Sequence, residues 1–272
     1  MQHQSISYKK SIINVSVFGT GNKLLICFHG YGENGKTFES LEKKLGNEYT
    51  LVATDFPFHG ETKWNEGLLL TPNDLLNILS IILQQIEIAK DKLSKFYVLA
   101  FSLGGRVALH ILQSAPAQIE RMVLIAPDGL HQNFWYWLGT QTSLGNKLFA
   151  QTMKRPYWFF TLTSFGYKLR LLNKSIVRIM HYYLDDEEGR LLLYQRWTTM
   201  RKFKPKPEVV VNAINNYKIP VRFLFGSYDR IILSKRSKSF KRNQHVKVTI
   251  INAGHQLLRE KFVEDIALLF SQ

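Results

Sequence analysis

The chain has 272 residues, of which 45% are hydrophobic and 21% charged, a balance typical of a globular protein that buries a substantial core. Its 36 lysine and arginine residues exceed the 21 acidic residues by 15, yet no zinc-ligand spacing, aromatic RNA-binding pattern or other nucleic-acid module accompanies this charge. We therefore expect one soluble globular domain with room for an insertion, and no nucleic-acid partner.

The N-terminus and the single cysteine indicate where the protein resides. Met1–Lys10 has no apolar core or small-residue cleavage site, which excludes a signal peptide there. The most apolar helical stretch, Leu75–Ala89, is interrupted by polar residues and is not expected to span a membrane. Cys27 lies in an apolar run and has no cysteine to pair with, so we expect a buried side chain and a cytoplasmic protein.

Apolar strand patterns alternate with helical patterns towards both ends of the chain. Ile6–Val17 reads as an opening antiparallel pair of strands. Six short apolar strands follow, at Lys23–Phe28, Thr50–Thr54, Phe96–Ala100, Arg121–Ile125, Val221–Phe225 and Val246–Ile251. Helical patterns fall between them, at Lys36–Leu45, Pro72–Lys90, Gly104–Ser114, Ser234–Phe240 and Arg259–Phe270. This alternation predicts an α/β fold with a mostly parallel, doubly wound sheet.

The middle of the chain has a different pattern. Strand signals vanish from about Gly129 to Glu208, and the segment becomes rich in aromatic residues and leucine at helical spacing. We predict a core formed by residues 1–128 and 208–272, and a helical lid formed by residues 129–207 after the sixth strand. Because a small insertion must bury something to be stable, we expect most of the 15 aromatic side chains from Phe134 to Trp197 to form the core of that lid.

Ser102 stands between a buried strand and a helix. The strand runs to Ala100 and the helix begins at Gly104, so the serine occupies a sharp strand-to-helix turn with a small residue two positions to either side. Such a turn strains the backbone of its central residue and lifts the hydroxyl above the sheet edge. The pattern resembles the nucleophile elbow of the α/β-hydrolase superfamily, which reads Gly-x-Ser-x-Gly, with alanine here in place of the first glycine.

Two further strand ends match this resemblance in the family's chain order. Asp229 follows the strand that ends at Phe225, and His255 follows the last strand. The resemblance implies that Ser102 is the nucleophile, that His255 is the general base and that Asp229 orients the histidine. Asp128, which ends the strand before the insertion, is the alternative acid.

The resemblance also implies an oxyanion hole. Phe28-His29-Gly30-Tyr31-Gly32 is similar to the family's His-Gly-x turn, and the backbone N–H groups of Tyr31 and Leu103 would stabilise a developing oxyanion. We interpret His29 as a brace beneath the site and not as a base. The remaining histidines have no metal-ligand spacing, and no glycine-rich phosphate loop is present, so no metal or cofactor is expected.

The resulting expectation is a serine esterase. We expect hydrolysis of a carboxylic ester with an apolar acyl or aromatic group, through an acyl-serine intermediate. A thioesterase, a carbon–carbon bond hydrolase and a carrier-protein ester esterase stay open as alternatives, as does a ligand-binding receptor on a hydrolase scaffold. Residues 131–207 hold 13 lysines and arginines against 4 acidic residues, so an anionic acyl carrier or an anionic lipid surface is a further candidate partner.

Overall fold

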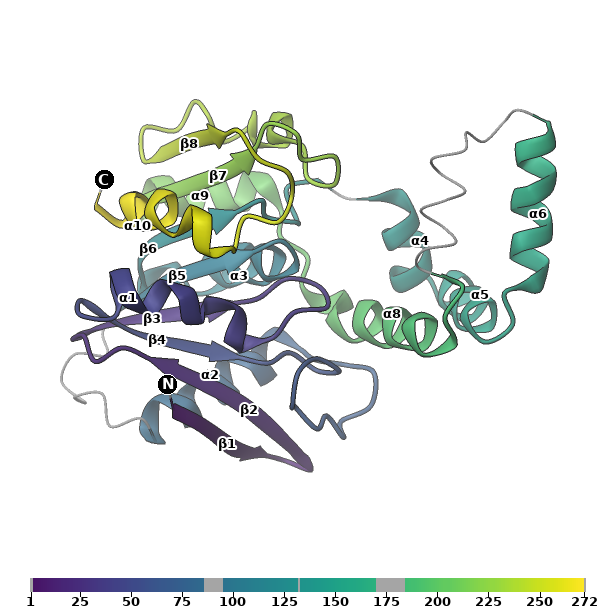
Figure 1. Ribbon diagram of the computed structural model, residues 1–272, viewed down its shortest axis with the longest axis horizontal. Coiled ribbons are helices and arrows are strands. Elements are labelled where there is room, and N and C mark those ends of the chain that lie inside the picture. The colour runs from purple at the N-terminus through teal and green to yellow at the C-terminus, as the bar shows by residue number, and fades with distance from the viewer. Residues whose placement is uncertain (1, 86–94, 132, 170–183, 272) are drawn as a thin grey trace. The chain divides into compact units, whose positions relative to one another are not determined.

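The computed structural model describes residues 2–85, 95–131, 133–169 and 184–271 (Figure 1). The chain forms two compact units. The first comprises Met1–Glu66, Thr71–His131 and Phe203–Gln272, and the second comprises Gly67–Leu70 and Gln132–Lys202. The first unit is built on one eight-stranded sheet whose strand order is β1-β2-β4-β3-β5-β6-β7-β8.

The strands lie close to the positions expected from the sequence. Their bounds are β1 Gln2–Tyr8, β2 Ser11–Phe18, β3 Lys23–Phe28, β4 Tyr49–Thr54, β5 Phe96–Phe101, β6 Ile119–Ile125, β7 Val221–Gly226 and β8 Val246–Ile251. β2 runs antiparallel to β1 and β4, and every pairing from β4 through β3 to β8 is parallel. The predicted α/β fold with a mostly parallel sheet is therefore confirmed.

Helices cover both faces of this sheet, as the near-continuous burial of its central strands requires. They are α1 Glu42–Leu45, α2 Pro72–Gln85, α3 Leu103–Ser114, α9 Pro207–Tyr217 and α10 Val263–Ser271. α1 and α10 lie on one face, and α3 and α9 lie together on the other (Figure 1). Since all residues of β4 are buried and β3 and β5 are buried from their second or third residue onward, the centre of the sheet forms the core.

The expected helices at Lys36–Leu45 and Ser234–Phe240 differ from those observed. The pattern at Lys36–Leu45 forms a 3₁₀ helix, Gly35–Leu41, followed by the short α1. Ser234–Phe240 forms only the 3₁₀ helix Ser234–Ser237, where the Ser237 hydroxyl donates to the Ser234 carbonyl and competes with the backbone pattern of an α-helix. The last five residues of Pro72–Lys90 lie outside the described residues.

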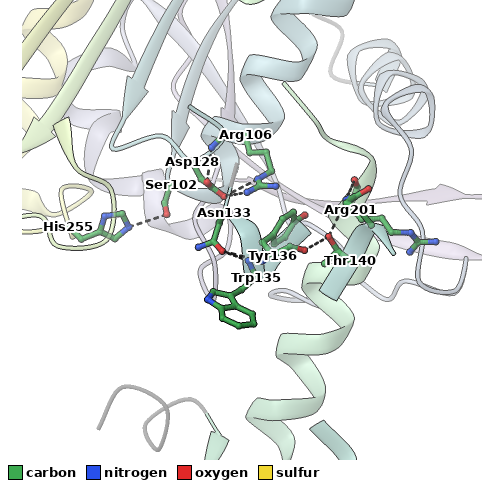
Figure 2. Close-up of polar contacts among 11 residues, drawn as sticks. Ser102, Arg106, Asp128, Asn133, Trp135, Tyr136, Thr140, Arg201 and His255 are labelled. Carbon is green, nitrogen blue, oxygen red and sulfur yellow. Dashed lines mark hydrogen bonds and ion pairs between the residues drawn. The ribbon is translucent and has the colours of Figure 1, made fainter. Parts of the chain in front are cut away.

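The described part of the second unit is helical, with α4 Phe134–Gln141, α5 Ser143–Lys154, α6 Tyr157–Lys168 and α8 Glu187–Thr199. Side chains cap three of these helices. Asn133 accepts from the N–H groups of Trp135 and Tyr136 at 2.9 and 3.2 Å (Figure 2), Thr142 caps α5, and Asp186 caps α8. Each cap satisfies backbone donors that the first turn of a helix leaves without partners.

The expectation that most aromatic residues of the insertion are buried is wrong. Of the 13 from Phe134 to Trp197 that the structure describes, only Tyr136 is buried and seven are exposed: Phe134, Trp135, Trp137, Tyr157, Trp158, Phe165 and Tyr167. Among the described residues of the second unit, the core is instead small and partly polar. Arg190 is buried there and donates to the carbonyls of Met153 and Leu184. Among the described residues, no helix has the length and apolarity needed to cross a bilayer.

Candidate active site

Ser102 has a backbone conformation that few side chains tolerate. Its φ is 48° and its ψ is −113°, between the end of β5 and the start of α3. Three backbone hydrogen bonds fix this turn: the Ser102 N–H donates to Ile125, and the Ser102 carbonyl accepts from Gly105 and Asp128 at 2.9 and 2.8 Å. A left-handed, non-glycine residue held by its surroundings is the strained turn that the sequence predicts.

The small residues around Ser102 are required by close contacts. A β-carbon on Gly104 would lie 2.1 Å from the carbonyl oxygen of Phe28, so only glycine lets α3 pass so close to the end of β3. A β-carbon on Gly105 would lie 2.3 Å from Pro127, a constraint that the residue pattern does not indicate. Ala100 is fully buried, which is consistent with the small side chain expected at this position.

Ser102, His255 and Asp229 form a continuous chain of hydrogen bonds. The Ser102 Oγ lies 3.0 Å from His255 Nε2, and His255 Nδ1 lies 2.7 Å from Asp229 Oδ2. Figure 2 shows the first of these contacts. The Asp229 side chain is fully buried, whereas 13% of the His255 side chain remains exposed. Residues from three strand ends thus meet at the carboxyl edge of the sheet, where ligands of open α/β sheets bind.

The environment of Asp229 keeps its carboxylate ionised. Burial alone raises the pKa of Asp229, but hydrogen bonds from His255 and from the N–H groups of Ile232 and Ile231 outweigh burial and hold the pKa below its usual range. An ionised carboxylate only accepts hydrogen bonds, so His255 Nδ1 must carry the ring proton. His255 Nε2 then presents its lone pair to the Ser102 hydroxyl, as a general base requires.

The turn after β3 is held by His29 and Glu33. His29 is fully buried; its Nε2 accepts from Phe56 N–H at 3.0 Å, so its protonated Nδ1 donates to the Gly30 carbonyl at 2.8 Å. With both ring nitrogens engaged, His29 has the bracing geometry expected from the sequence. The Glu33 carboxylate accepts from Gly30 N–H at 3.0 Å. Burial raises the pKa of Glu33. The hydrogen bond from Gly30 and the nearby His255 lower this pKa, but by less than burial raises it.

The two expected oxyanion donors lie on these elements. Leu103 is the first residue of α3, so its N–H has no acceptor within the helix. Tyr31 directly follows Gly30, whose N–H and carbonyl are both fixed by side chains. The role of Glu33 was not anticipated; the only signal was an acidic residue three positions after Gly30 in an otherwise neutral turn.

Asp128, the alternative acid, has a different partner. Its carboxylate lies 2.9 Å from Arg106 Nε and 2.7 Å from Arg106 Nη2 (Figure 2), and it also accepts from Gly129 N–H. The carboxylate that contacts His255 is that of Asp229. The Asp128–Arg106 pair instead joins the end of β6 to α3, the two elements on either side of the elbow. No group of three potential metal ligands occurs among the described residues.

Comparisons with known proteins agree with this fold. A family model described as serine aminopeptidase, S33, matches residues 20–261. Pimeloyl-[acyl-carrier protein] methyl ester esterases from Vibrio parahaemolyticus and Nitrosomonas europaea are each 27% identical, over 137 residues (50% of this chain) and 179 residues (61% of this chain). The chain thus spans 49% and 65% of the length of these relatives. A thermophilic esterase from Thermogutta terrifontis matches with a TM-score of 0.67 at 13% identity, covering 100% of this chain and 97% of that one.

The contacts of the two aspartates generate a testable distinction. Asp229→Asn keeps an acceptor for the Ile231 and Ile232 N–H groups but removes the anion that orients His255, so we expect a fall in kcat approaching about 10,000-fold, as for triad carboxylates elsewhere. The variant should unfold at nearly the temperature of the parent. Steady-state hydrolysis of a short p-nitrophenyl ester and thermal unfolding measure the two effects.

Asp128→Asn is the matched control. It leaves the Arg106 side chain, only 8% exposed, without its counter-charge, so the unfolding temperature should fall while kcat falls far less than in Asp229→Asn. A larger loss of kcat in Asp128→Asn than in Asp229→Asn would assign the orienting role to the earlier strand.

Proposed function

Because the chain belongs to the S33 family of the α/β-hydrolase superfamily, we propose that it is a serine hydrolase that cleaves a carboxylic ester with an apolar acyl or aromatic group. The single observation that carries the proposal is the unbroken path of hydrogen bonds from the Ser102 hydroxyl through His255 to the buried Asp229. A hydroxyl is a weak nucleophile at neutral pH, and this path supplies the base that activates it.

The first half of the proposed reaction forms an acyl-enzyme. The Ser102 Oγ attacks the ester carbonyl carbon while its proton passes to His255 Nε2. The carbonyl oxygen becomes an oxyanion that the N–H groups of Tyr31 and Leu103 stabilise. When the tetrahedral intermediate collapses, the bond to the alkoxy oxygen breaks, and the protonated Nε2 gives its proton to the departing alcohol.

The second half regenerates the enzyme. A water molecule gives a proton to His255 Nε2 as its oxygen attacks the acyl carbon, and a second tetrahedral intermediate forms in the same oxyanion hole. The bond to Ser102 Oγ then breaks, the serine recovers its proton from His255, and the carboxylic acid leaves. Asp229 stays ionised throughout, because its role is to stabilise the imidazolium formed in each half.

Covalent labelling tests the role proposed for Ser102. An active-site fluorophosphonate should add once to the parent chain and not to Ser102→Ala, because among the described residues only this hydroxyl contacts a histidine held by a buried carboxylate. Intact-mass measurement of parent and variant after labelling gives the result.

Turnover separates the enzyme from a receptor on the same scaffold. A receptor would release at most about one product per chain in a burst experiment, whereas the enzyme continues at a steady rate. Labelling of Ser102→Ala to the same extent as the parent would remove Ser102 from the mechanism. Assaying a thioester and an aminoacyl anilide beside the ester tests the alternative leaving groups.

The substrate wall is proposed to come from the second unit, acting as a lid. The chain enters this unit a few residues after Asp128, whose N–H donates to the carbonyl of Ser102 at 2.8 Å. The insertion therefore starts beside the nucleophile. Its aromatic content supports an apolar acyl or aromatic substrate, since a lid that excludes water also strengthens the electrostatic contacts of the site.

An apolar acyl site predicts that kcat/KM rises with acyl length over the short and middle range. Each buried methylene offers about 0.8 kcal/mol, which corresponds to roughly a four-fold change when it is used in the transition state. A series of p-nitrophenyl esters from acetate to octanoate measures the slope. A flat series would indicate a polar substrate or an open site.

An ester linked to an acidic carrier protein is a second candidate substrate. Residues 131–207 carry an excess of nine positive charges, and the two relatives described above are named for an acyl-carrier ester. Positive charge near an entrance raises the encounter rate with an anionic partner, and salt screens it over about 10 Å at 0.1 M.

Salt dependence tests this candidate. The second-order rate constant for a carrier-linked acyl ester should fall steeply from low to moderate salt, and that for its neutral methyl ester should not. Changing Lys154, Arg155 and Lys168 to Gln should lessen the fall. Removing three charges at Lys10, Lys63 and Lys218, exposed lysines outside residues 131–207 and 230–259, serves as the control. Equal salt dependence for both substrates would leave the carrier without support.

A further inference from the structure

Helix α6 exposes the side that a helix of a globular protein normally buries. Trp158, Leu162, Phe165 and Leu169 recur at helical spacing, and between 41% and 59% of each is exposed. Thr163 is the only side chain of α6 that is buried. We call these four residues the α6 stripe. Apolar side chains at this spacing form the buried face of an ordinary amphipathic helix, yet no described part of the chain buries the stripe.

The charges around the stripe are of one sign. Tyr157–Tyr167 contains no charged residue, while Lys154, Arg155 and Lys168 lie at its two ends and are exposed. None of these three cations makes an ion pair within the part of the chain that the structure describes. The sequence has no acidic residue between Asp128 and Asp185.

The first unit has a positive surface of its own. From Arg230 to Arg259 the sequence holds eight lysines and arginines and no acidic residue. Lys235, Lys238, Lys241, Arg242 and Lys247 are exposed, and no ion pair to them occurs among the described residues. Both units therefore attract the same class of partner, one with a high density of negative charge.

We propose that α6 docks on the surface of an anionic lipid bilayer. Aromatic rings and leucines enter the boundary between headgroups and acyl chains, while flanking lysines and arginines meet lipid phosphates. With 12 residues, α6 is too short to span a bilayer and lies in its surface. A second copy of this chain fits less well, because two such surfaces carry like charge. An acidic carrier satisfies the cations but leaves the stripe without an apolar partner.

This placement rests on and deepens the proposed function, because apolar esters concentrate in bilayers. Vesicle binding is measured without turnover, so its result is independent of whether the chain hydrolyses esters. The experiment is co-sedimentation of the full chain with vesicles of phosphatidylcholine alone, or of equimolar phosphatidylcholine and phosphatidylglycerol. We expect binding to the anionic vesicles only, weakening as salt rises. Equal binding to both vesicles, or to neither, would overturn the proposal.

A matched pair of variants locates the contact. Leu162→Gln with Phe165→Gln removes two members of the stripe and should weaken binding to anionic vesicles at least about ten-fold. Val209→Gln with Tyr217→Gln removes two exposed apolar side chains of α9 and should leave binding unchanged.

Two other occupants of the stripe give different outcomes. If the α6 variant binds vesicles like the parent, the stripe does not face lipid. If it loses hydrolysis of a water-soluble short ester, or changes from a dimer to a monomer in light scattering, the stripe covers substrate or a second copy. Each of these results overturns the proposal, whereas lost vesicle binding with unchanged soluble hydrolysis and oligomeric state supports it.

Discussion

The approach of α3 to the end of β3 is the constraint on which the candidate site depends. Gly104 brings the start of the helix so close to Phe28 that any side chain there would meet backbone, and Ser102 accepts a left-handed conformation as a result. Such a conformation costs on the order of 1–3 kcal/mol and persists only where its surroundings fix it. Here the surroundings are backbone hydrogen bonds to β6 and its following turn, so Ser102 is positioned by the sheet itself.

The carboxylates at this edge of the sheet have separate partners, which keeps their roles distinct. Asp229 is committed to His255 and two backbone N–H groups, and Asp128 to Arg106. Asp55 accepts from Asn14, Gly35 and the N–H of Glu61 and so fixes the turn after β4. Since removing one partner of a buried ion leaves an uncompensated charge, each pairing resists exchange with the others. Of these three carboxylates, only that of Asp229 contacts His255.

The parts of the fold and site that the sequence could predict are those governed by local rules. Apolar runs bounded by turns located β3 and β8 at their observed bounds, and small residues around Ser102 identified the elbow. The sequence does not show which carboxylate contacts His255, because Asp128 and Asp229 both end a strand at the same edge. The two residues differ only in their three-dimensional neighbours. The Arg106–Asp128 pair joins residues 22 positions apart in sequence, and the Gly30–Glu33 contact depends on a turn geometry that residue types do not specify.

The second unit shows a further limit of what the sequence predicts. Helical spacing indicates the helices described there, and it places Trp158, Leu162 and Phe165 of α6, with the C-cap residue Leu169, on one side. Periodicity states that such a side needs an apolar environment, but it does not state whether protein or lipid provides it. Composition carries that information. Packing of the stripe in a protein core does not require cations at both ends of the helix or a stretch without acidic residues. Both features favour binding to an anionic bilayer. The exposed aromatics and the positive charge of this chain therefore have a common physical explanation.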